Sequence, residues 1–180
     1  MSELQSLFDT ISSVEYRDLP PIEKWHPDRT ASIDIEIRSD GSWWHEGSEI
    51  VRKELRKLFA SILRLEEDQE YYLVTPVEKL KIIVADAPLM IVESTRFTDE
   101  ESQSHIAVRT NMDDSLQLGE EHCLELRADI PYVYVRRGLW AKVNRSVYYE
   151  WVEWGEQRMD GEHAYLALKS GNSEFTLGAL

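Results

Sequence analysis

The sequence is poor in cysteine and in long apolar runs, and each shortage excludes a class of structure. Cys123 is the only cysteine among the 180 residues, so neither an internal disulfide nor a zinc site with four cysteine ligands can form. No apolar run approaches the roughly 20 residues that a membrane-spanning helix needs. The first eight residues lack the basic start and apolar stretch of a secretory signal. We therefore predict a cytoplasmic protein.

Positive charge is also scarce, which limits the classes of partner. The chain has 34 acidic and 20 basic residues, a formal net charge of -14. Duplex nucleic acid and anionic membrane surfaces would be repelled, because proteins bind them largely by neutralising phosphates with Lys and Arg. We predict neither a nucleic-acid nor a membrane partner. A local basic pocket could still hold one small anion.

Motifs for catalysis, phosphate binding and metal binding are missing. The eight glycines are isolated, so neither common phosphate-binding loop is present. No Gly-x-Ser-x-Gly nucleophile elbow occurs. The five histidines include no pair at i, i+4 that would suggest a metal site. From these absences we predict no catalytic residue, no metal and no cofactor, and we interpret Cys123 as a buried structural thiol.

Apolar content and periodicity predict an α+β protein with its own core. Hydrophobic residues make up 42% of the chain. Helical spacing predicts a short helix within residues 4–11, and three prolines within residues 18–27 indicate an extended arm. Alternating apolar residues on either side of Asp40-Gly41 predict a hairpin over residues 32–46.

Two amphipathic helices, each followed by strands, organise the rest of the chain. We predict one helix over residues 48–64, capped by Ser48, and a second from Leu139 through Trp154. Strands are predicted over residues 71–75, 79–85, 89–93, 106–109, 123–127, 132–135, 164–168 and 175–177. This organisation gives an N-terminal helix (1–17) and two similar α+β domains, 18–95 and 96–180.

An internal similarity suggests duplication. Residues 50–64 and the strand at 71–75 resemble residues 139–153 and the strand at 165–168. Any two amphipathic helices can align this well, so chance similarity is the competing interpretation. The shared order of strands, one helix and more strands favours duplication as a hypothesis.

Polar side chains gather in three short segments. An apolar strand is interrupted at Thr75-Pro76-Val77-Glu78-Lys79. This segment is either a turn with a solvated ion pair or a loop that presents polar groups to a ligand. Arg136-Arg137 and Arg52-Lys53 lie at the predicted helix starts, where cations oppose the macrodipole. Such cations can form an anion site together with the free N–H groups of the helix start. The alternative is that acidic side chains from elsewhere in the chain pair with them. Thr110-Asn111 ends a predicted strand.

The chain resembles an uncharacterised proteobacterial family, domain of unknown function twelve-eighty-five, over roughly residues 20–178. The match includes Tyr72-Leu73-Val74-Thr75-Pro76-Val77-Glu78-Lys79, and its most specific part is Thr75-Pro76-Val77-Glu78-Lys79. The other matching motifs are Pro20-Pro21 with Trp25 and Pro27, Ile33-Asp34-Ile35, Asp40-Gly41, Trp44-His45-Glu46-Gly47, Ile50, Arg52, Thr110-Asn111, Arg136-Arg137-Gly138-Leu139 and Arg145. The sequence departs after Pro88, where an aromatic residue is expected and Leu89 occurs.

The resemblance implies a duplicated domain whose C-terminal half is similar to pleckstrin-homology-like barrels. It also implies a nucleotide-like ligand at the interface of the halves and a role in signalling. The ligand-binding residues that it implies are His45, Arg52, Thr75, Glu78, Lys79, Asn111, Arg136 and Arg145.

Three hypotheses for the function follow. The first is a regulatory module that holds a small anionic, nucleotide-like ligand between its two halves. The alternative is a protein–protein interaction adaptor, which the many aromatic residues and the proline-containing arm favour. The third is an enzyme with His45 or Glu78 as acid or base and Lys79 or an arginine on the substrate's charge. Because no catalytic motif supports the third, we predict a binding module.

Overall fold

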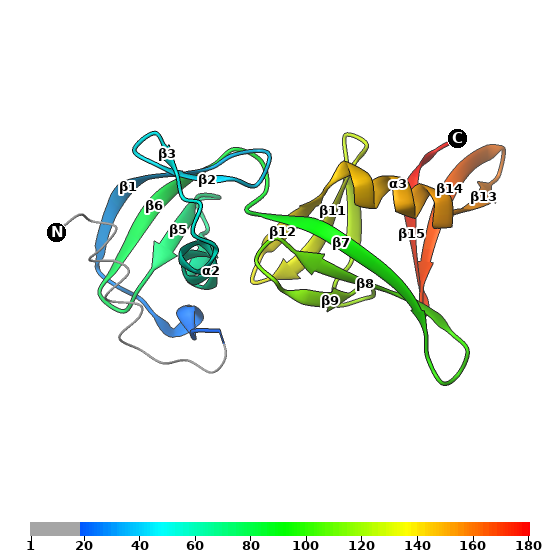
Figure 1. The fold of residues 1–180 in the computed structure, drawn as a ribbon, viewed down its shortest axis with the longest axis horizontal. Helices are drawn as coiled ribbons and strands as arrows, with labels where there is room; N and C mark the ends of the chain where they lie inside the picture. The colour runs from blue at the N-terminus through cyan, green and yellow to red at the C-terminus, as the bar shows by residue number, and fades with distance from the viewer. Residues whose placement is uncertain (1–18) are drawn as a thin grey trace. The chain divides into compact units, whose positions relative to one another are not determined.

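The computed structural model describes residues 19–180 and divides the chain into two units, Met1–Asp86 and Ala87–Leu180 (Figure 1). The helix predicted within residues 1–17 lies outside the described residues. The predicted boundary at 95/96 falls inside strand β7 (Leu89–Thr98), whereas the units divide just before this strand.

The N-terminal unit is one six-stranded sheet with a helix. Its elements are η1 (Ile22–Lys24), β1 (Arg29–Ile37), β2 (Trp43–His45), β3 (Ser48–Glu49), α2 (Lys53–Ser61), β4 (Leu63–Leu65), β5 (Tyr71–Val74) and β6 (Glu78–Val84). The strand order is β3-β2-β1-β6-β5-β4, and β1 and β6 pair in parallel. Helix α2 packs through Phe59, whose ring stacks on that of Trp43 with centroids 6.4 Å apart.

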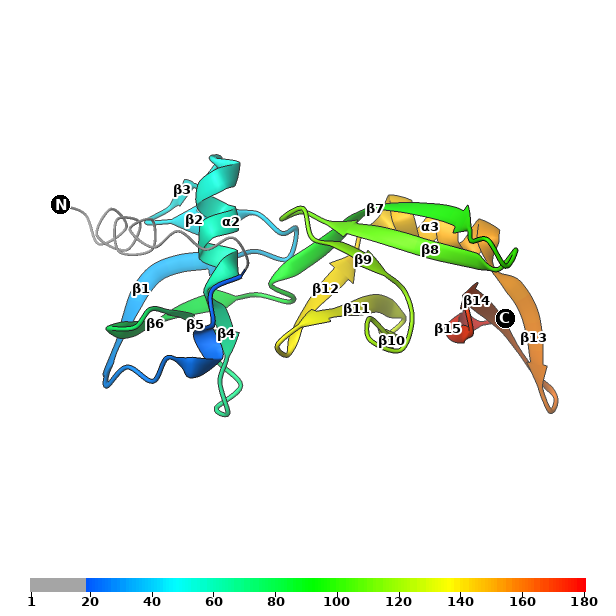
Figure 2. The same cartoon turned by 90° about the horizontal axis from the view of Figure 1, so that it is seen from below.

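The C-terminal unit holds a second six-stranded sheet, which curls into a half-barrel, and a three-stranded sheet (Figure 2). The first sheet contains β7, β8 (Ser104–Thr110), β9 (Ser115–Gln117), β10 (Leu124–Arg127), β11 (Ile130–Arg136) and β12 (Leu139–Val143). Then follow α3 (Arg145–Trp154), β13 (Glu156–Asp160), β14 (His163–Ser170) and β15 (Ser173–Ala179).

The two six-stranded sheets have the same topology. Each sheet consists of two three-stranded meanders. They are joined in the middle of the sheet, where the strand that comes first in the chain pairs in parallel with the strand that comes last, β1 with β6 and β7 with β12. The helices occupy different places: α2 connects the two meanders of its sheet, whereas α3 follows the second meander. The prediction of two similar α+β halves is therefore confirmed, and the repeated feature is the sheet rather than the position of the helix.

The predicted hairpin over residues 32–46 is confirmed, but the first helix is shorter than predicted. Ser48 does not cap it, because Ser48 pairs with His45 as part of β3. Helix α2 begins after Arg52, whose side chain makes no capping hydrogen bond. At the other end Leu63 pairs with Leu73 of β5, so strand pairing replaces the last helical turn.

The second predicted helix begins at Arg145 instead of Leu139. Alternate residues of β12 (Leu139, Ala141 and Val143) are buried, a period of two that belongs to a strand. Arg137 and Gly138, with φ values of 50° and 76°, form the tight turn from β11 to β12. The prediction that Arg136 and Arg137 lie at a helix start is therefore wrong, since Arg136 ends β11 and Arg137 lies in the turn that follows.

The cores contain the largest aromatic side chains. Trp43 in the N-terminal unit and Trp151 in the C-terminal unit are fully buried. Cys123 is half-buried rather than buried. Within the described residues, no helix is long and apolar enough to cross a membrane.

Candidate functional site

Thr75 organises the turn between β5 and β6. Its side chain is buried, and its hydroxyl Oγ1 accepts hydrogen bonds from the amides of Val77 (3.3 Å) and Glu78 (3.1 Å). The hydroxyl also lies 3.1 Å from the carbonyl of Glu78, to which it donates. All these contacts lie inside the turn, so the structure gives Thr75 a structural role.

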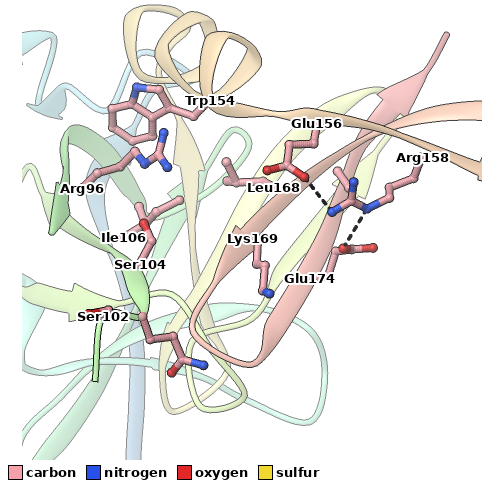
Figure 3. A pocket seen from close by; sticks show the side chains of 12 residues that line it. Arg96, Ser102, Ser104, Ile106, Trp154, Glu156, Arg158, Leu168, Lys169 and Glu174 are labelled. Carbon is pink, nitrogen blue, oxygen red and sulfur yellow. Dashed lines mark hydrogen bonds and ion pairs between the residues drawn. The ribbon is translucent and has the colours of Figure 1, made fainter. Parts of the chain in front are cut away.

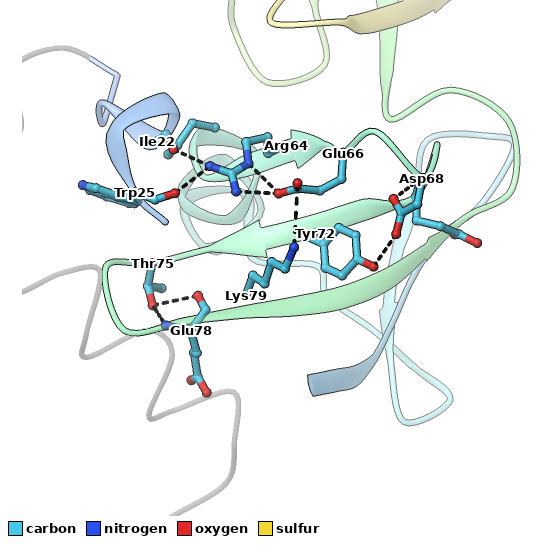
Figure 4. A network of polar contacts seen from close by, with 10 residues as sticks. Ile22, Trp25, Arg64, Glu66, Asp68, Tyr72, Thr75, Glu78 and Lys79 are labelled. Carbon is cyan, nitrogen blue, oxygen red and sulfur yellow. Dashed lines mark hydrogen bonds and ion pairs between the residues drawn. The ribbon is translucent and has the colours of Figure 1, made fainter. Parts of the chain in front are cut away.

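Glu78 and Lys79 lie at the start of β6, each in contact with an opposite charge, and Figure 4 shows the pair that Lys79 forms with Glu66. Glu78 Oε2 is 3.3 Å from Arg29 Nε. Lys79 Nζ is 3.7 Å from Glu66 Oε2 and 4.9 Å from the ring centroid of Tyr72. The segment is thus a turn whose two charged side chains pair with residues outside it, Arg29 and Glu66.

A cavity of about 570 Å³ opens beside Lys79 in the N-terminal unit. Arg64, one of its lining residues, donates to the carbonyls of Ile22 (2.6 Å) and Trp25 (2.9 Å) and pairs with Glu66 (Figure 4). Its charged lining residues are Glu23, Arg64, Glu66, Glu67, Asp68 and Lys79, with His26 beside them. Four carboxylates against two cations make this cavity unsuitable for an anion.

Asp68 and Tyr72 form a polar pair in this network. The Tyr72 hydroxyl donates to Asp68 Oδ2 at 2.8 Å. This hydrogen bond is the main reason that the pKa of Asp68 is lowered and the pKa of Tyr72 is raised. Both shifts keep the carboxylate charged and the phenol protonated at neutral pH, which holds the hydrogen bond in one direction.

Two more candidates of this unit lie on its surface or edge. His45 is half-buried at the end of β2, opposite Ile35 and Ser48. Arg52 is exposed at the start of α2. Neither lines the 570 Å³ cavity.

In the C-terminal unit, Asn111 and Arg136 stabilise one corner of the curled sheet. Asn111 Oδ1 accepts from the amide of Met90 (3.1 Å), and the Asn111 amide donates to the Met90 carbonyl (2.8 Å). Arg136 Nη1 donates to Asp114 Oδ1 at 2.5 Å, and both side chains are largely buried. Asn111 therefore binds the backbone of Met90, and Arg136 pairs with the carboxylate of Asp114 in the same unit.

Arg145 has a different environment. It is exposed at the first position of α3, and within residues 19–180 it forms no ion pair. It lines a groove of about 380 Å³, the Arg145 groove, whose other lining residues are Asp129, Ile130, Pro131, Lys142, Val143, Tyr148 and Tyr149. The Tyr149 side chain is 61% exposed, whereas the Tyr148 hydroxyl is held by the Leu177 carbonyl at 3.0 Å.

A further cavity of the C-terminal unit, about 230 Å³, was missed in the sequence (Figure 3). Arg96 of β7, Trp154 at the end of α3, and Arg158 and Lys169 of the three-stranded sheet line it. These residues are far apart in the chain and share no motif. Only the pairing of distant strands brings them together, so the sequence carried no signal for this cavity.

The structure thus gathers Thr75, Glu78 and Lys79 at one turn and Asn111 and Arg136 near one corner. It places Arg145 in a groove that none of the other seven candidates lines. Among the described residues, no group of three or more His, Cys, Asp or Glu side chains could hold a metal ion.

Comparisons with known proteins give the family of the chain. The model of the N-terminal domain of a domain of unknown function, DUF1285, matches residues 20–87, and that of the C-terminal domain of the DUF1285 protein of unknown function matches residues 88–177. No curated protein matches.

Two solved structures are similar to this chain. A DUF1285 family protein from Silicibacter pomeroyi DSS-3 is 32% identical with a TM-score of 0.82, the match covering 97% of this chain and 95% of that one. A DUF1285 family protein from Shewanella baltica OS155 is 34% identical with a TM-score of 0.54, the match covering 66% of this chain and 90% of that one. The chain therefore belongs to the DUF1285 family.

Proposed function

We propose that the protein binds a small anionic ligand with a flat, nucleotide-like group, and that the ligand occupies the Arg145 groove. The observation that carries this proposal is the position of Arg145, an exposed cation without an ion pair among the described residues, in a groove with an exposed tyrosine. A guanidinium binds phosphate or carboxylate in a bidentate manner, and an exposed ring offers a stacking surface.

The local charge supports an anion. The groove has the two cations Lys142 and Arg145 against the single carboxylate of Asp129, in a chain of net charge -14. The N-terminus of α3 adds partial positive charge, since its first N–H groups have no partner inside the helix. Asn144 caps only one of them, accepting from the Val147 amide at 2.9 Å.

The apolar part of the groove supports a flat organic group rather than an inorganic ion. Ile130, Pro131 and Val143 form apolar lining beside the two tyrosines. The volume of about 380 Å³ falls within the range of about 300–1,000 Å³ that is usual for small-molecule sites.

The proposal also includes the prediction that the C-terminal unit is pleckstrin-homology-like. A pleckstrin-homology-like character of the C-terminal unit is supported by its curled sheet with one adjacent helix. A fold of this kind does not by itself identify a ligand, so the proposal of an anionic ligand rests on the residues of the Arg145 groove. A role in signalling and a cytoplasmic location stay predictions.

The proposal is tested by thermal-shift scans of the purified protein against nucleotides, nucleotide second messengers and phosphorylated metabolites. A ligand at 100 times its Kd stabilises the protein by about 2.7 kcal/mol, or roughly 5–11 °C for a chain of this length. We expect such a shift from a compound that combines an anionic group with a flat ring. A panel that leaves the Tm unchanged throughout would contradict the proposal.

A protein-interaction adaptor is the second candidate. It is favoured by exposed apolar residues, Ile130 (37%) and Tyr149 (61%) in the groove and Val152 (38%) further along α3. Tyr149 and Val152 are three residues apart and therefore share one face of α3. If no small molecule binds, a partner recovered with the wild-type protein and lost with Tyr149→Ser would support this function.

A further inference from the structure

We propose that the 230 Å³ cavity of the C-terminal unit is a second binding site, selective for a compact oxyanion, the phosphate or carboxylate end of a small molecule. We name it the Arg96–Lys169 cavity. None of its lining residues lines the Arg145 groove, so this site goes beyond the function proposed above.

Two cations of the cavity are available to a ligand. Arg96 and Lys169 are exposed, and within residues 19–180 neither forms an ion pair. The Arg96 guanidinium carbon lies 5.6 Å from the ring centroid of Trp154 (Figure 3). Stacking uses the face of a guanidinium and leaves the N–H donors at its edge free to bind an oxyanion.

The two carboxylates of the cavity are already engaged by the third cation. Arg158 Nη2 lies 2.7 Å from Glu156 Oε2, and Arg158 Nε lies 3.4 Å from Glu174 Oε2 (Figure 3). Three cations and two carboxylates leave one excess positive charge in the lining. Arg158 and its two carboxylates together carry one negative charge, which the two positive charges of Arg96 and Lys169 outweigh.

Size and neutral groups restrict the ligand further. Ser102 and Ser104 supply hydroxyl donors, and Ile106, Ala167 and Leu168 supply an apolar wall. A volume of about 230 Å³ is below the usual range of about 300 Å³ and more for sites of larger ligands. The cavity therefore suits a compact anion with a short carbon chain and is too small for a nucleotide.

Direct hydrogen bonds hold the walls of the cavity together. The Ser170 hydroxyl, which is buried, accepts from the Ile106 amide (3.0 Å) and donates to the Leu118 carbonyl (2.8 Å). The Gly171 amide donates to the Ser104 carbonyl at 2.8 Å, and Gln103 Nε2 donates to Asn172 Oδ1 at 2.8 Å. These bonds join the β14–β15 hairpin to the β7–β8 hairpin and to Leu118, which follows β9, so the site is formed before a ligand binds.

The test is an amide NMR titration of the full chain, with sodium phosphate in one arm and sodium succinate in the other, at constant ionic strength. We expect saturable shifts of the Ser104 and Lys169 amides in at least one arm. The arm that saturates tells whether the cavity prefers a phosphate or a carboxylate.

Three variants make the titration decisive. Arg96→Ala and Lys169→Ala should each weaken binding about tenfold or more, whereas Arg96→Lys keeps the charge and should lose less. Arg29→Ala removes one positive charge from a side chain that is 73% exposed in the other unit and should bind like the wild type. Absence of saturation in both arms, or saturation that persists in Arg96→Ala and Lys169→Ala, overturns the proposal.

Discussion

At the residue scale, side chains that are typical of ligand sites serve the fold at several positions. Thr75, Asn111 and Arg136 all lie at strand ends, where sequence reasoning expects ligand-binding groups. Each of them instead satisfies backbone groups or a partly buried carboxylate within its own unit. A strand end needs such partners whether or not a ligand binds, so residue type and position alone do not distinguish the two roles.

The structural role of Thr75 leads to a test on stability. In Thr75→Val the shape is kept, but the amides of Val77 and Glu78 lose their acceptor. We expect the free energy of unfolding to fall by about 1–3 kcal/mol in urea titrations. Thr176→Val, at an exposed position of β15, serves as the control and should change it by less than about 0.5 kcal/mol. Equal stability of Thr75→Val and the wild type would contradict the structural role.

At the scale of elements, local patterns predicted strands well and helix ends poorly. Alternating apolar residues identified the β1–β2 hairpin and most strands of the C-terminal unit. The segment 139–143 fits both a helix stripe and a strand, and its pairing with β11 and β7 decides in favour of the strand. Strand β13 has one apolar residue, the exposed Met159, and so no apolar alternation; its pairing with β14 defines it.

The start of α3 provides the test at this scale. Asn144 Oδ1 accepts from the Val147 amide at 2.9 Å, which places the cap five residues after Leu139. Asn144→Ala should lower the free energy of unfolding by about 1 kcal/mol, whereas Asn144→Asp keeps an acceptor and should retain most of the stability. If the two variants were equally destabilised, the capping role of Asn144 would be refuted.

At the scale of the whole molecule, the duplicated topology could be predicted only in outline. The order of elements along the chain suggested two similar halves, but the parallel pairings of β1 with β6 and β7 with β12 join strands that are distant in sequence. The same limit applies to the candidate sites. Arg145 was predicted from its family motif, whereas Arg96 and Lys169 meet only through the tertiary fold.

The division of the chain can be tested with fragments. A fragment of residues 87–180 keeps all of β7, including the buried Leu89 and Ile91, and should show cooperative thermal unfolding. A fragment of residues 96–180 loses the part of β7 that pairs with β12 and should fail to fold. Circular dichroism melts of the two fragments check this, and a cooperative transition in the shorter one would contradict the boundary at residues 86 and 87.

The central claim is that Arg145 binds the anionic group of the ligand. The most direct measurement is the Kd, by isothermal titration calorimetry, of the compound that gives the largest thermal shift, for the wild type, Arg145→Ala and Arg52→Ala. Arg52 is the matched control, since it is also an exposed arginine at the start of a helix but lines none of the three cavities. We predict a Kd raised about tenfold or more for Arg145→Ala, a loss of about 1.4 kcal/mol, and an unchanged Kd for Arg52→Ala. An unchanged Kd for Arg145→Ala would contradict the account.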